Sequence, residues 1–220
     1  MKVTLLACTP DADRICAAAA RSCYSERGAS EMMGSIEPEK ALPRVIAMGH
    51  LSVVEHAAFT FSVEGASRSL THQLVRHRIA SFSQQSQRYV SMEDAGFVVP
   101  HTVEADSEAE GLYKETMERI WAAYARLVEL GVPNEDARYV LPNGCTTNIT
   151  ITMNARELLH FFSLRCCSRA QWEIREMACQ MLELCRKVSP LIFKDAGPAC
   201  VRGPCPEGEK SCGRPWTKAD

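Results

Sequence analysis

The sequence predicts an α+β fold: a single domain in which long helices flank a mixed or antiparallel central sheet. Segments that alternate apolar and polar residues are separated by longer stretches of helical periodicity. Regular strand–helix–strand alternation is missing, as is a Gly-x-Gly-x-x-Gly turn, which argues against a Rossmann unit. The chain has 220 residues, 46% of them hydrophobic, and this is enough for one sizeable core.

The first part of the chain is predicted to contain two strands and two helices. Phe59, Phe61 and Val63 alternate with polar residues, so they face the core from a half-exposed strand. Pro10 and Pro38 suit the first position of a helix. The expected elements are a strand over 1–7, a helix capped at Thr9, a polar loop over 28–35, a helix from 38 towards 49, and a strand over 59–64.

The second part is predicted to be richer in helix. Gly131 is a helix stop, and Asn154 with Glu157 has the spacing of a capping box. Leu112 and Trp121 are expected to face inward. The expected elements are a helix capped by Ser67 that runs into 76–78, a loop over 81–87, a short strand over 97–100, a helix over 107–130, a short helix from 134, a strand over 149–153, a helix from 155 past 164, and a helix from 168 to 188.

Composition limits the classes of function. With 25 Lys+Arg against 27 Asp+Glu, no global positive field attracts nucleic acid. No apolar run is long enough to span a membrane, the first residues do not resemble a signal peptide, and a cytoplasmic protein is expected. In that reducing compartment most of the 11 cysteines are expected to be small buried hydrophobic residues and not to form disulfides. We expect one domain over 1–195 and a tail rich in Cys, Gly and Pro over 196–220.

Two segments are rich in arginine and almost free of acids. No carboxylate lies between Glu64 and Glu93, and Glu157 is the only one in 137–171. Guanidinium groups bind phosphates and planar carbonyl edges through paired hydrogen bonds, so these segments point to nucleotide-like ligands. A solvated basic face is the alternative, but such faces usually mix both signs of charge.

One of these segments carries a recognisable signature. Arg76-His77-Arg78 is followed after seven residues by Ser86-Gln87-Arg88, and the chain thereby resembles the flavin-dependent thymidylate synthases, with five fixed identities in 13 residues. Further matching blocks follow in chain order: Gly49-His50-x-Ser52, Glu55-His56-Ala57-x-Phe59-Thr60-Phe61, Val132-Pro133, Ala137-Arg138, Leu141-Pro142, Asn154-Ala155-Arg156, Leu164-Arg165 and Ala170-Gln171-Trp172-Glu173. The tail lies outside this match.

The resemblance implies an enzyme that converts dUMP to dTMP with bound FAD, in a cytoplasmic homotetramer with shared active sites. It implies 5,10-methylenetetrahydrofolate as the carbon donor and NADPH as the source of electrons. The residues implied for dUMP are Gln73, Arg76, Gln84, Gln85, Ser86, Gln87, Arg88, Arg138 and Arg165. Those implied for FAD are His50, Ser52, Arg76, His77, Arg78, Gln84, Asn154, Arg156 and His160.

Two positions depart from the residues common in the family. Gln84 replaces a frequent Glu, which makes the predicted pocket more positive, and His160 replaces a frequent Asn while keeping a hydrogen-bonding side chain. His50 is expected either to contact flavin or folate or to be structural, whereas His56 is expected to be structural. No metal ligand set is predicted.

Methylation at carbon 5 of uracil requires that this carbon become nucleophilic. A cysteine thiolate can attack carbon 6, or a guanidinium can stabilise negative charge at ring nitrogen 3. The resemblance assigns the second role to Arg165, the predicted catalytic residue. Ser86 is interpreted as a ligand to the nucleotide, because a serine without a base in reach is a weak nucleophile.

Three alternatives remain open. Cys200, Cys205 and Cys212 could hold a metal with Cys166-Cys167, although their spacing fits no common zinc motif. The arginine-rich loop could belong to a non-catalytic module that binds nucleotides or RNA, but Phe82 is its only aromatic residue between Arg76 and Arg88. A related flavoenzyme could methylate uracil in RNA.

Overall fold

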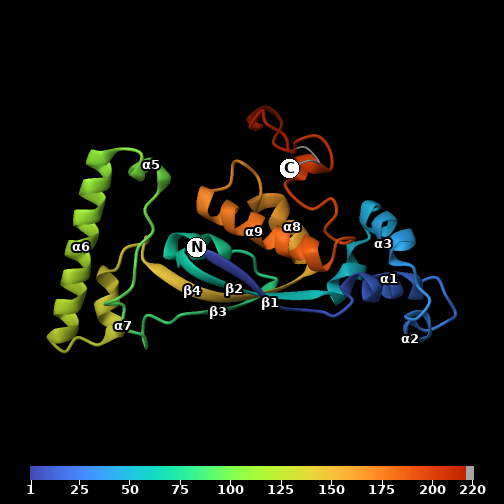
Figure 1. Ribbon diagram of the computed structural model, residues 1–220, viewed down its shortest axis with the longest axis horizontal. Helices are drawn as coiled ribbons and strands as arrows, with labels where there is room; N and C mark the ends of the chain where they lie inside the picture. The colour runs from blue at the N-terminus through green and yellow to red at the C-terminus, as the bar shows by residue number, and fades with distance from the viewer. Residues whose placement is uncertain (217–220) are drawn as a thin grey trace. The chain divides into compact units, whose positions relative to one another are not determined.

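A computed structural model describes residues 1–216 and confirms the predicted fold class. Helices and strands are mixed, and the four strands form one open antiparallel sheet in the order β1-β2-β4-β3. The strands are β1 (Lys2–Cys8), β2 (Ala58–Ser67), β3 (Ala80–Gln84) and β4 (Thr146–Asn154). The helices are α1 (Ala12–Ser22), α2 (Ala29–Met32), α3 (Pro38–Ala47), α4 (Arg68–Leu74), α5 (His101–Glu104), α6 (Ser107–Glu129), α7 (Asn134–Ala137), α8 (Ala155–Arg165) and α9 (Trp172–Val188). Figure 1 labels these elements along the chain, except for α4.

The chain divides into two compact units. The first comprises Met1–Lys2, Val63–Arg76 and Ser83–Ile149, and the second comprises Val3–Ser62, His77–Phe82 and residues 150–216. Each of the four strands contributes residues to both units. In the described part of the chain, no helix has the length and apolar character needed to cross a membrane.

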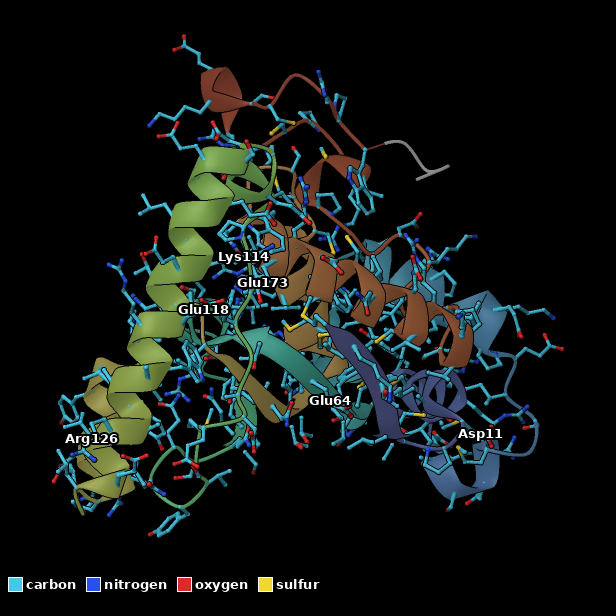
Figure 2. The ribbon with its side chains drawn as sticks, turned by 60° about the vertical axis from the view of Figure 1, so that its left-hand side comes forward. Asp11, Glu64, Lys114, Glu118, Arg126 and Glu173 are labelled. Atoms are coloured by element: carbon cyan, nitrogen blue, oxygen red, sulfur yellow. The ribbon has the colours of Figure 1, made fainter. Side chains whose placement is uncertain are left out.

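The core of the first unit forms under helix α6. Tyr124 is fully buried, and its hydroxyl accepts a hydrogen bond from the backbone N–H of Met92 at 3.1 Å. Trp121 donates from its indole nitrogen to the Met92 carbonyl at 3.0 Å, which fixes the loop that follows Arg88. The solvent-exposed positions of α6 carry charged side chains, among them Lys114 and Arg126, which Figure 2 labels. This amphipathic pattern is why residues 107–129 form one long helix.

The core of the second unit is built from phenylalanines on β2, α8 and the segment after α9. The ring of Phe193 lies edge-on to Phe59 at 5.3 Å and to Phe162 at 5.9 Å, measured between ring centroids. The Asp13 carboxylate accepts hydrogen bonds from the backbone N–H groups of Leu191 and Ile192, which ties this segment to α1. Figure 1 shows α8 and α9 side by side in this unit.

Several predicted element boundaries were wrong. The polar stretch 81–87, predicted as a loop, begins within strand β3, which lies at the edge of the sheet beside β4. An edge strand can be polar on both faces, so apolar alternation does not reveal it. The last helix begins at Trp172 with Gln171 as its cap, and Leu112 is 67% exposed. Residues 97–100 form only an isolated bridge, from Phe97 to Cys145.

Candidate active site

The signature Arg76-His77-Arg78 follows the end of helix α4. The helix is capped by Ser67, whose hydroxyl accepts a hydrogen bond from the Leu70 N–H at 3.0 Å. The helix was predicted to run into the signature at 76–78. It ends at Leu74 instead, so the signature lies in an irregular segment. Its arginines are exposed, whereas the His77 side chain is buried.

Both ring nitrogens of His77 are hydrogen-bonded within the second unit. Nε2 accepts a bond from Nε of Arg165 at 3.1 Å. Nε2 therefore carries the lone pair and Nδ1 the hydrogen, so Nδ1–H donates to Oε1 of Glu157 at 3.1 Å. The chain of bonds from Glu157 through His77 to Arg165 fixes the histidine as one neutral tautomer.

The electrostatics of this network agree with that tautomer. Burial lowers the pKa of His77 below its usual 6.5, and the positive charge of Arg165 lowers it further, while Glu157 partly opposes both effects. Burial also lowers the pKa of Arg165, yet a guanidinium remains protonated at any physiological pH. The network thus presents a cationic arginine bonded to a neutral imidazole.

In the first unit, Glu135 on α7 bonds two of the arginines predicted to bind dUMP. Its carboxylate accepts from Nε of Arg88 at 2.8 Å, and its backbone carbonyl accepts from Nε of Arg138 at 3.0 Å. The guanidinium of Arg88 also lies 5.5 Å from the ring centroid of Tyr89. The Arg88–Glu135 pair is about half exposed, so solvent screens it strongly.

Arg88, Arg138 and Arg165 share one feature of geometry. Each is bonded through Nε to its own chain, and among residues 1–216 no hydrogen bond is found from the terminal nitrogens of any of the three. A guanidinium held in this way is oriented while its two terminal NH2 groups are available for a bidentate contact with a phosphate or a carbonyl edge.

The glutamines of the signature loop, residues 76–88, and Gln73 just before it differ in where their side chains point. The Gln84 amide donates to the Thr71 hydroxyl at 3.1 Å, so this predicted ligand also fixes β3 to α4. Gln87 is buried and donates to Sγ of Cys145 at 3.8 Å. Gln85 and Gln73 are half-buried. The amide carbonyls of Gln84 and Gln87, by contrast, have no hydrogen bond from the described residues.

Ser86 does not have the environment of a nucleophile. Its hydroxyl accepts the backbone N–H of Arg88 at 3.3 Å, which shapes the turn that presents this arginine. The histidine nearest in sequence, His77, uses its Nε2 lone pair to accept from Arg165 and cannot take a proton from a serine in this geometry. The interpretation of Ser86 as a ligand is consistent with these contacts.

The remaining predicted flavin residues lie in the second unit. His50 and Ser52 are exposed around the start of the short 3-10 helix Leu51–His56. The Asn154 side chain accepts the Glu157 N–H at 2.9 Å and thereby caps α8, as predicted. Arg156 is exposed and pairs with Glu55. His160 is exposed as well, with its ring centroid 6.0 Å from that of His77.

Sequence reasoning assigned no ligand or catalytic role to Glu157 or Glu135. For Glu157 a signal was present, because it is the only acid in the arginine-rich stretch 137–171. Its spacing from Asn154 was attributed to a capping box, but its carboxylate bonds His77. Glu135 lies beside acidic Asp136 and carries no comparable signal.

The cysteine beside the signature loop is a poor nucleophile. Cys145 is fully buried, and burial raises the pKa of its thiol, although Arg68 and the hydrogen bond from Gln87 oppose this. Cys166, next to Arg165, is also buried, and its thiol pKa is raised through its hydrogen bond with Cys179 and by burial. Both thiols stay protonated near neutral pH.

The tail cysteines gather at one small cavity of about 20 Å³ in the second unit. Cys200, Cys205 and Cys212 line it together with Cys167. Among the described residues, however, no three His, Cys, Asp or Glu side chains are arranged to hold a metal ion.

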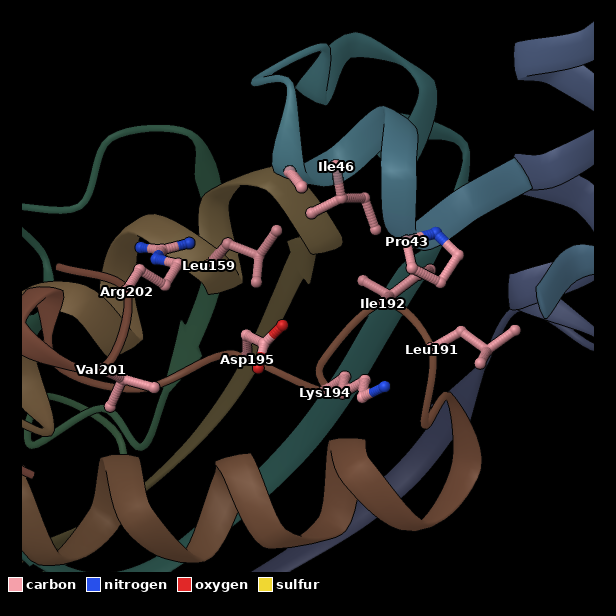
Figure 3. Close-up of a pocket in the computed structure, with 10 residues that line it drawn as sticks. Pro43, Ile46, Leu159, Leu191, Ile192, Lys194, Asp195, Val201 and Arg202 are labelled. Carbon is pink, nitrogen blue, oxygen red and sulfur yellow. The ribbon is translucent and has the colours of Figure 1, made fainter. Parts of the chain in front are cut away.

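A larger cavity, of about 340 Å³, also lies within the second unit and was not anticipated from the sequence (Figure 3). Its apolar walls come from Ile46 on α3, Leu159 on α8 and Ile192. Its charged lining residues are Lys194, Asp195 and Arg202, which carry both signs of charge. None of the predicted site residues lines it, so it is distinct from the groups described above.

Arginines oriented through Nε, with their terminal nitrogens bonded to no described residue, are typical of proteins that bind phosphates and planar carbonyl edges. Comparison with known proteins narrows the class. Residues 4–191 match the model of the thymidylate synthase complementing protein family. The chain belongs to this family, the flavin-dependent thymidylate synthases.

Three relatives illustrate the match, and each is named flavin-dependent thymidylate synthase. The Geobacter sulfurreducens protein is 52% identical over 97% of this chain and 94% of its own length. The Clostridium tetani protein is 46% identical over 97% of this chain and 94% of its own length. The Pyrococcus horikoshii protein is 46% identical over 95% of this chain and 91% of its own length.

Proposed function

We propose that this protein synthesises dTMP by reductive methylation of dUMP, with 5,10-methylenetetrahydrofolate as carbon donor, NADPH as electron source and FAD as cofactor. Family membership supports the reaction, and one structural observation carries the assignment of the catalytic residue. Arg165 is cationic, is oriented through Nε by His77, and has terminal nitrogens that bond no described residue.

The role of Arg165 follows from the chemistry of uracil. Removing the proton from ring nitrogen 3 raises electron density at carbon 5, and a fixed guanidinium stabilises the resulting anion. Because Arg165 is partly buried, its charge is less screened than that of an exposed arginine. This route needs no enzyme thiol, in keeping with the protonated thiols of Cys145 and Cys166.

The dUMP phosphate needs donors that stay charged at every pH, and Arg88 and Arg138 meet this need through their terminal nitrogens. The side-chain carbonyls of the glutamines and the Ser86 hydroxyl in the signature loop would form hydrogen bonds with the edge of the uracil ring. The proposed dUMP set is Gln73, Arg76, Gln84, Gln85, Ser86, Gln87, Arg88, Arg138 and Arg165.

The donor set fits FAD in charge and exposure. The exposed side chains of Arg76, Arg78 and Arg156 offer positive charge to a pyrophosphate, and those of His50, Ser52 and His160 offer polar contacts. Gln84, Asn154 and His77 complete the proposed set. Both ring nitrogens of His77 are already hydrogen-bonded, so this residue would contact FAD through its main-chain atoms. Bound FAD supplies hydride transfer, and the protein supplies orientation and charge.

We further propose a cytoplasmic homotetramer with shared active sites that acts on small molecules and not on nucleic acid. The exposure of so many polar site residues supports a pocket completed by another copy of the chain. Residues 1–195 would form the catalytic domain and 196–220 a tail.

The visible absorption spectrum of the purified protein tests this function. A flavin band is expected, shifted by dUMP alone and bleached by NADPH without oxygen. Arg78→Ala should be colourless with an unchanged circular dichroism spectrum, whereas Arg119→Ala, which removes an exposed arginine of α6, should keep its flavin. A protein that neither contains nor binds FAD would refute the proposal. A flavoprotein indifferent to dUMP would point to uracil in RNA.

A further inference from the structure

We propose that Glu157 is a positioning residue for the methylation reaction: acting through His77, it fixes the guanidinium of Arg165 in the orientation that stabilises the uracil anion. This inference rests on the proposed function of Arg165 and adds a residue to it. Glu157 touches neither substrate nor cofactor in this scheme, so its effect on the reaction passes entirely through His77 and Arg165.

The geometry of helix α8 explains why an intermediary is needed. Glu157 and Arg165 are eight residues apart, about 12 Å along the helix axis, which is too far for a direct bond. Phe161 lies midway, so Glu157, Phe161 and Arg165 follow one another at intervals of four residues on one face of the helix. The His77 ring lies edge-on to Phe161, with 4.9 Å between ring centroids, and thereby bridges the two charged residues.

The burial of this network makes its hydrogen bonds consequential. Glu157 is 7% exposed and His77 is 5% exposed. A carboxylate removed from water is costly unless it is bonded, and a buried imidazole without partners is costly too. The Nδ1–H of His77 and the Glu157 carboxylate satisfy each other, so neither group is free to choose another orientation.

The direction of the hydrogen bonds shows what Glu157 controls. By accepting the Nδ1–H, Glu157 leaves a lone pair on Nε2, and only a lone pair can accept the Nε–H of Arg165. Without Glu157 the imidazole can place a hydrogen on Nε2, opposite the Nε–H donor of Arg165. Two donors would then face each other, and the guanidinium would lose its fixed position.

Other charged groups near the network are few. Besides its two bonded partners, His160 also lowers the pKa of His77, and its ring centroid is 6.0 Å from that of His77. Among residues 1–216, Arg165 is the only cation bonded to the His77 ring. Glu157 is the carboxylate among these groups. Its loss would therefore remove the acceptor that holds the hydrogen of His77 on Nδ1.

The first test compares Glu157→Ala, Glu157→Gln and Arg165→Ala by turnover per bound flavin. Misplacing a catalytic group by about 1 Å can cost a hundredfold in rate, so Glu157→Ala should lower kcat about 10- to 100-fold while the KM for dUMP changes less than about threefold. Glu157→Gln should be partly rescued, because its amide oxygen can still accept the Nδ1–H. The double variant Glu157→Ala/Arg165→Ala should be no slower than Arg165→Ala.

The second test uses pH to distinguish positioning from a merely structural role. A tenfold weaker stabilisation of the anion corresponds to one pH unit, so the acid limb of kcat should move upward by about one unit in Glu157→Ala. A matched control is Glu173→Gln, which neutralises another buried glutamate of the second unit and should leave this limb in place.

The outcomes separate the two proposals. Normal kcat in Glu157→Ala, an unmoved acid limb, or losses that multiply in the double variant would overturn the role of Glu157. Full activity in Arg165→Ala would instead overturn the role of Arg165 on which the inference depends.

Discussion

Two arginines that are held in the same way lie in very different surroundings. Arg165 is bonded through Nε to the buried imidazole of His77, and Arg88 is bonded through Nε to the half-exposed carboxylate of Glu135. No residue in the described part of the chain bonds the terminal nitrogens of either arginine. The difference teaches that one hydrogen-bond geometry can hold a poorly screened charge in one place and a solvated, adjustable charge in another. In the proposed mechanism the first charge would serve the chemical step and the second would serve binding.

Replacing the buried arginine should have the largest effect. We expect Arg165→Ala to fold and to keep FAD but to lower kcat for dTMP formation about 10²- to 10³-fold, the usual cost of losing one donor to a developing anion. Product formation per bound flavin measures this loss, and circular dichroism controls for folding. Turnover close to that of the unmodified enzyme would show that another group activates uracil.

Replacing the exposed arginine should affect binding and largely spare the chemical step. A hydrogen bond to a charged group contributes about 1.5–3 kcal/mol, so Arg88→Ala should raise the KM for dUMP about 10- to 100-fold and leave kcat within about threefold. Steady-state kinetics at several dUMP concentrations separate the two constants. A loss confined to kcat would contradict the contrast with Arg165.

The sequence could predict the arginines but not this contrast between them. The fold class, the long helix Ser107–Glu129 and the caps at Ser67 and Asn154 follow from local patterns, because periodicity and capping depend on near neighbours. The signature also indicates which arginines to consider. Whether each is buried, and which acid holds it, depends on contacts between residues far apart in the sequence.

His77 shows most clearly what local patterns miss. The resemblance implies a flavin contact for it, yet its ring is enclosed in the structure by α8, 80 residues further along the chain. Strand β3 is a second case, because a polar edge strand is defined by its pairing with β4 and not by an apolar pattern of its own. In both cases tertiary contacts determine a structural feature that the local sequence does not indicate.

Removing the acid that holds the exposed arginine should have a small effect. Exposed ion pairs are worth about 0–1 kcal/mol, so Glu135→Gln should change the KM for dUMP by less than about fivefold and leave the melting temperature almost unchanged. Raising the salt concentration should reduce even that difference. If Glu135→Gln impaired turnover as strongly as Glu157→Ala, exposure would not distinguish the two arginine environments.

The last expected effect concerns the pH dependence of stability, and it arises from the buried network. The pKa of His77 in the folded protein lies below its usual 6.5, mainly because of burial, so between these two values the unfolded chain binds more protons than the folded one. The free energy of unfolding should therefore fall as pH drops below about 6.5, by at most about 1.4 kcal/mol per pH unit from this group, and the contribution should be constant above that range. Urea unfolding at pH 5.5 and 7.5 measures the slope.

The double variant His77→Phe/Glu157→Met removes both ionisable groups while keeping apolar volume against Phe161, and it should show a shallower slope. His72→Gln, which removes an exposed histidine, controls for the loss of one imidazole. An equal slope in the double variant would mean that the neutral imidazole on which the Arg165 bond depends is not maintained by the fold.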